Sequence, residues 1–201
     1  TCTEVDVTSA RLGSVIMLFG SSAQRLDQAT LESASWLGPA LAEAVHICKV
    51  NASAGLSARP TMSFGVVLAM QLLEPATRVE SHRASLLQPD VLEALEYACV
   101  NDFPLLGTGV ANYAAGTLVA LLGKNEGGQT LSRATVNAVL DNAAMYFDPS
   151  QYLYHQRPRR VLQILHRIAN VAISDANKGF LLQHDRLLDT LVAGLLLDDD
   201  N

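Results

Sequence analysis

Short apolar stretches with helical spacing, separated by proline, run through most of this sequence. The prolines lie at positions 39, 60, 75, 89, 104, 149 and 158, and four of the consecutive intervals are between 14 and 21 residues long. Proline suits the first turn of a helix, because its missing N–H would have no intrahelical partner there. No stretch combines strict alternation of apolar and polar residues with β-branched enrichment, as strands do. The sequence therefore predicts an all-α fold with essentially no sheet.

Eleven helices are predicted from this spacing, over residues 9–19, 25–37, 39–50, 60–73, 77–87, 89–100, 109–123, 131–147, 158–173, 176–183 and 185–197. The clearest is 158–173, whose apolar residues recur at i, i+3, i+4 and i+7 and form one buried stripe. For helix 131–147 we expect Thr130 to be the N-cap, because its hydroxyl can accept a free backbone N–H.

The number and shortness of these helices favour a stacked arrangement. Alanine and leucine together fill 59 of 201 positions, and only 17% of the residues are charged. Short helices so rich in apolar residues must bury more than one side, whereas a four-helix bundle uses fewer and longer helices. No charge run or Ser/Pro-rich tract marks a linker, so one domain is expected over residues 1–201. We expect this domain to be part of a longer polypeptide and to expose some apolar surface at its ends.

Two internal echoes suggest repeats. Residues 117–120 (TLVA) recur at 190–193, and residues 140–144 (LDNAA) are echoed at 168–172 (IANVA). The stretch from 160 to 197, with IANVA, then DANK at 175–178 and the leucines up to Leu197, resembles armadillo repeats. The echoes are 28 and 73 residues apart, whereas the family period is about 40–47 residues. The resemblance implies a right-handed α-solenoid, an armadillo/HEAT-like superhelix, with degenerate repeats.

The resemblance also implies candidate binding residues. In armadillo proteins an asparagine on the third helix holds the backbone of an extended partner in a concave groove. Asn170 and Asn142 match that motif position. The tryptophan that often stands four residues earlier in nuclear-import members is replaced by His166 and Ala138. The alternative is a structural asparagine on a polar helix stripe.

A polar ladder of Arg160, Gln163, Arg167 and Asn170 is expected along one side of helix 158–173. Guanidinium groups on one face can hold a carboxylate, a phosphate or an acidic peptide. The alternative is a solvated surface, or internal pairing with Asp185 or Asp189.

Several function classes are excluded by charge and motif. The net charge of −6 and the predicted pI near 5.3 argue against nucleic acid as a partner. No segment is long enough to span a bilayer. The three cysteines show neither a disulfide framework nor zinc spacing, which favours a reducing, cytoplasmic location. The histidines, glycines and serines match no metal, phosphate-loop or nucleophile-elbow pattern. We therefore expect no enzyme, no metal and no cofactor.

The sequence thus predicts a non-enzymatic scaffold or adaptor that binds a protein or an extended, acidic peptide segment. Two alternatives remain open. The chain can instead be a structural subunit of a large multiprotein assembly, or the regulatory helical domain of a larger enzyme.

Overall fold

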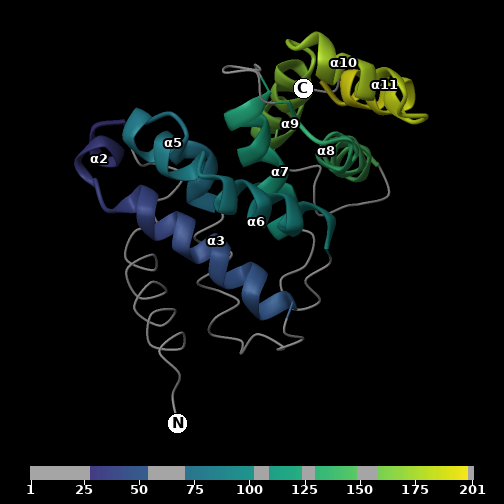
Figure 1. Ribbon diagram of the computed structural model, residues 1–201. Coiled ribbons are helices and arrows are strands. Elements are labelled where there is room, and N and C mark those ends of the chain that lie inside the picture. Colours follow the sequence, from purple (N-terminus) through teal and green to yellow (C-terminus); the bar gives the residue numbers. More distant parts are fainter. Residues whose placement is uncertain (1–27, 54–70, 102–108, 124–129, 149–157, 199–201) are drawn as a thin grey trace. The chain divides into compact units, whose positions relative to one another are not determined.

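The computed structural model describes residues 28–53, 71–101, 109–123, 130–148 and 158–198 (Figure 1). Within these ranges every regular element is a helix and no strand occurs, which confirms the predicted all-α class. The predicted helix 9–19 lies outside the described residues, and so does most of 60–73, although residues 71–76 are helical.

The chain divides into two compact units, residues 1–117 and 118–201. The boundary falls inside helix α7 (Gly109–Leu122). Because a helix needs continuous helix-forming residues, a boundary at this place leaves no linker composition in the sequence. The sequence therefore contains no local signal of this division into two units, and one domain over residues 1–201 stays a prediction.

The first unit contains α2 (Gln28–Ser33), α3 (Leu37–Ser53), α5 (Glu80–Leu86) and α6 (Pro89–Val100). Helix α3 packs against both α5 and α6, as Figure 1 shows. Helix α6 has the bounds that the sequence predicts, because Pro89 takes its first position and the apolar spacing continues to its end.

One close approach fixes the corner between α2, α3 and α5. A Cβ atom on Gly38 would lie 2.8 Å from the Cα of His82, so only glycine allows α3 to come this near to α5. The fully buried His82 ring donates a hydrogen bond through Nε2 to the Leu31 carbonyl oxygen, 2.8 Å away. This imidazole therefore ties α5 to the end of α2.

The second unit contains α8 (Arg133–Tyr146), α9 (Pro158–Val171), α10 (Asp175–Leu182) and α11 (Leu187–Asp198). Helix α8 contacts the other three, and its buried residues include Leu140 and Ala143. All four helices begin and end within two residues of their predicted bounds. The packing of these helices is established, whereas the right-handed solenoid stays a prediction.

The predicted N-cap of α8 was wrong. Ser132, and not Thr130, precedes the helix in extended conformation, and its Oγ accepts a hydrogen bond from the Thr135 backbone N–H at 3.2 Å. A capping hydroxyl must stand two or three residues before the N–H that it accepts. The helix begins two residues later than expected, so Thr130 is too far from the first free N–H groups.

Candidate functional site

Helix α9 carries most of the predicted site and buries one clear apolar side. Ile164, Ile168 and Val171 are at most 6% exposed, as the helical spacing predicts. Helix α9 includes Arg160, but the side chain of that residue lies outside the described part of the structure, and so do the preceding residues 149–157.

The predicted ladder on α9 does not present all its members to solvent. Gln163 is exposed and Asn170 is half-buried, whereas Arg167 is only 5% exposed. The reason is its place on the helix: Arg167 stands three residues after Ile164 and four before Val171, so it shares their buried side. Its aliphatic stem can pack there with the apolar residues. The expected exposed position of Arg167 was therefore wrong.

The two motif asparagines have different surroundings. Asn142 donates a hydrogen bond through Nδ2 to the Ala138 carbonyl oxygen of its own helix, 2.7 Å away. That contact is typical of a structural asparagine. Asn170 packs through its backbone near Gly123, where an added Cβ would lie 3.2 Å from the Asn170 carbonyl oxygen. Among the described residues no hydrogen bond holds the Asn170 carboxamide, so its amide groups are available to a partner.

A fully buried asparagine that connects two segments was not singled out by sequence reasoning. Asn177 on α10 is fully buried, and its Oδ1 accepts a hydrogen bond from the Leu131 backbone N–H at 3.2 Å. Its Nδ2 donates to the Gly123 carbonyl oxygen at 3.3 Å. One side chain thus joins the two ends of the connection between α7 and α8. The sequence does contain a signal for the burial of Asn177: it stands four residues before Leu181 and therefore lies on the apolar side of α10.

Helix α11 exposes large apolar side chains over one side, which we call the α11 face. Leu188 is 74% exposed, Val192 54%, Leu195 65% and Leu196 63%. Residues four and seven apart lie on the same side of a helix, so these four side chains are neighbours. The opposite side of α11 is turned inward: Thr190 and Gly194 are buried.

The inward side of α11 packs very closely. A Cβ atom on Gly194 would lie 2.8 Å from Cε2 of Phe147, whose ring is 1% exposed. The small residues Thr190 and Gly194 therefore meet the core, while Leu188, Val192, Leu195 and Leu196 face outward. A helix that is apolar on all sides is normally covered on all sides. The described residues cover α11 on one side only, so the α11 face is an exposed apolar surface.

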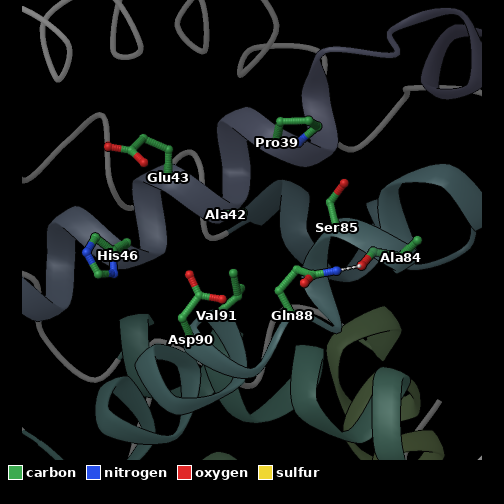
Figure 2. A pocket seen from close by; sticks show the side chains of 9 residues that line it. All are labelled: Pro39, Ala42, Glu43, His46, Ala84, Ser85, Gln88, Asp90 and Val91. Carbon is green, nitrogen blue, oxygen red and sulfur yellow. Dashed lines mark hydrogen bonds between the residues drawn. The ribbon is translucent and has the colours of Figure 1, made fainter.

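The first unit contains an open groove between α3, α5 and the start of α6 (Figure 2). Its volume is about 590 Å³. The lining residues come from all three helices and the turn before α6: Pro39, Ala42, Glu43, His46, Ala84, Ser85, Gln88, Asp90 and Val91.

The walls of the groove are part polar and part apolar, and they are open to solvent. Glu43, His46 and Asp90 are all exposed, and Gln88 donates a hydrogen bond through Nε2 to the Ala84 carbonyl oxygen at 3.2 Å. Within the described ranges no group of three or more His, Cys, Asp or Glu side chains is arranged to hold a metal ion. The same part of the chain has no helix with both the length and the apolar character needed to cross a membrane.

Comparisons with known protein families, with characterised proteins and with solved structures find no match for this chain. The likeness to armadillo repeats therefore rests on the sequence motif alone.

Proposed function

We propose that this chain is a non-enzymatic interaction scaffold that binds a protein partner through the exposed helix surface of its second unit. The observation that supports the proposal is the α11 face, with four large apolar side chains between 54% and 74% exposed. The proposed architecture is an armadillo-like stack, in which such a helix side is a contact surface. We propose a cytoplasmic location for it, as expected from the cysteine pattern.

The free energy of burying apolar side chains favours binding of a partner to the α11 face. Full burial of one Leu or Val side chain stabilises by about 1.5–3 kcal/mol relative to exposure. Since more than half of the surface of each of these four residues is still exposed, covering the α11 face would contribute on the order of 5 kcal/mol before the costs of association. Contacts of this size are a large part of what a stable protein complex requires.

Helix α9 supports a second contact of the same scaffold. The Asn170 carboxamide can donate to and accept from a peptide group, and Gln163 stands exposed about two turns before it. Asn170 and Gln163 can therefore still bind an extended segment, as the sequence predicts, although Arg167 is not exposed to solvent beside them. Arg160 remains a proposed member that would favour an acidic segment.

A structural subunit of a large assembly is the second candidate function. The apolar character of the α11 face favours it, because permanent interfaces are more apolar than transient ones. The two candidate functions differ in how readily the bound protein dissociates: an adaptor releases its partner on dilution, whereas a permanent subunit stays assembled. A regulatory role within a larger enzyme would use the same surface.

The test compares two valines of similar exposure on different units. Val192 on the α11 face is 54% exposed, and Val100 at the end of α6 is 57% exposed. The protein would be isolated from its native source with its bound proteins, and each purified partner would be bound again to the wild type, to V192K and to V100K. We expect V192K to weaken binding at least about tenfold, because an ammonium group replaces apolar contact area, and V100K to bind like the wild type.

Two results would contradict the proposal. If no isolated protein binds the purified chain directly, the chain is not a scaffold for a protein partner. If V192K and V100K bind a partner equally well, the α11 face is not the contact surface. Thermal melting followed by circular dichroism verifies that both variants are folded, which is expected because both positions are exposed.

A further inference from the structure

We propose that the α11 face binds an amphipathic helix of a partner protein, whose apolar stripe is flanked by lysine or arginine. This inference deepens the proposed function and rests on it. It adds the secondary structure and the charge of the bound segment.

The backbone of α11 decides that the bound segment is a helix. Within a helix the N–H and C=O groups are paired with each other, so the middle of α11 offers side chains and no free backbone groups. A segment that docks on this surface therefore has to satisfy its own backbone hydrogen bonds while it buries apolar side chains. A helix does so, whereas an extended strand would bury unpaired donors and acceptors. The stripe from Leu188 to Leu196 rises about 12 Å, which matches two to three turns of a partner helix.

The charges beside the α11 face decide the chemistry of that helix. Asp189 precedes Val192 by three residues within α11, so it borders this face, and Asp185 lies in the turn directly before the helix. The side chain of Asp185 is 94% exposed, and Asp189 is exposed as well. From residue 187 to residue 201 there is no lysine or arginine, and three further aspartates follow at 198–200.

One basic residue, Arg186, lies directly before α11. It is exposed in the turn between α10 and α11, and its backbone carbonyl oxygen accepts a hydrogen bond from the Thr190 N–H at 3.0 Å. Two carboxylates, those of Asp185 and Asp189, stand against this one cation, so the described residues beside the start of the α11 face carry a net negative charge. A second copy of the chain, or an anionic lipid surface, would bring like charges together at this border. Lysine or arginine beside the apolar stripe of a partner helix would instead face opposite charges.

The test uses three synthetic helical peptides as probes. The first has leucines at i, i+3, i+4 and i+7 with lysines on both flanks, the second has glutamates in place of the lysines, and the third is a scrambled version of the first. Binding to the wild type, to V192K and to V100K would be measured by fluorescence anisotropy. We expect the lysine peptide to bind at least about tenfold more tightly than the glutamate peptide, because two or more rim charge pairs form. V192K should lose this binding and V100K should keep it, and the difference between peptides should shrink at about 0.5 M salt.

Each other outcome overturns the inference in a distinguishable way. Equal binding of the scrambled peptide would show general attraction to an acidic chain. Equal binding of the glutamate peptide, still lost in V192K, would leave the scaffold function standing and refute the charge preference. No binding of any peptide, with an isolated partner still lost in V192K, would refute the helical occupant alone. If isolated partners bind V192K as well as V100K, the proposed function fails too.

Two further occupants are tested directly. Sedimentation velocity would reveal a dimer, and a dimer that V192K abolishes would show that a second copy covers the α11 face. Flotation with vesicles of phosphatidylserine and phosphatidylcholine would reveal a lipid surface as the occupant. We expect neither self-association nor vesicle binding through this face, and either result overturns the inference.

Discussion

Replacing Asn177 should destabilise the second unit more than any other single loss of a carboxamide among its described residues. Its side chain is fully buried and pairs with the Leu131 N–H at 3.2 Å and the Gly123 carbonyl oxygen at 3.3 Å. In N177L the new side chain fills a similar volume and offers no hydrogen bond. Both backbone groups then lose this partner, and the apolar side chain leaves no room for a water molecule to replace it.

The magnitude follows from the two contacts. A buried polar group left without a partner costs about 1–3 kcal/mol. Two such groups would cost about 2–6 kcal/mol, and the added apolar contact of leucine offsets part of this. We therefore expect N177L to lower the free energy of unfolding by about 2–4 kcal/mol. N177A should lose less, since a water molecule can enter the vacated polar site and bridge the two groups.

The assay is urea denaturation followed by circular dichroism, with N170A as the matched control. Asn170 lies in the same unit and is half-buried, and no hydrogen bond of its carboxamide is found among the described residues. N170A should change the free energy of unfolding by less than about 0.5 kcal/mol. If N177L and N170A have equal effects, the Asn177 carboxamide does not hold the connection between α7 and α8. If N177A costs more than N177L, the volume of the side chain matters and its hydrogen bonds do not.

Two further predictions concern packing and charge in the same unit. Gly194→Ala should destabilise by about 1–3 kcal/mol, because its Cβ would lie 2.8 Å from the buried Phe147 ring. Gly179→Ala meets nothing within 4 Å and should stabilise by up to about 1 kcal/mol through helix propensity; equal melting temperatures for the two variants would refute the contact. The hydrogen bond from Lys178, and then its positive charge, lower the pKa of the exposed Asp175 carboxyl. K178M should return this pKa to its ordinary value, as read from carboxyl chemical shifts in an NMR titration. Because the pKa is lowered in the folded state, any stability from this pair is present above the ordinary carboxyl pKa and is lost as the pH falls through the folded one. An unchanged Asp175 titration in K178M would contradict this cause.

Helix positions were largely predictable because the signals are local. Helix α6 begins at Pro89 and ends where its apolar spacing ends, as expected. The bounds of α8 to α11 deviate by at most two residues. The wrong N-cap, Thr130 instead of Ser132, shows the limit of such signals. Both residues carry a hydroxyl, and only the position at which the backbone turns helical decides between them.

The functional surface was much less predictable, because burial depends on residues that are distant in the chain. Arg167 and Asn170 both belong to the predicted polar ladder of α9, yet the charged Arg167 is buried and the neutral Asn170 is half-buried. Asn177 connects two segments because it forms hydrogen bonds with the backbones of Gly123 and Leu131, which lie 54 and 46 residues away in the sequence.

Helix α11 shows most clearly how local sequence and packing against distant residues each contribute to the structure. Its leucines, valine and alanine by themselves determine that residues 187–198 form a helix, because helix formation depends on neighbours within one or two turns. Since the helix is apolar on nearly every side, its sequence contains no period that distinguishes a core side from a binding side. The tertiary structure makes that choice: Phe147 comes so close that only Gly194 fits against it, and this contact turns Leu188, Val192, Leu195 and Leu196 outward.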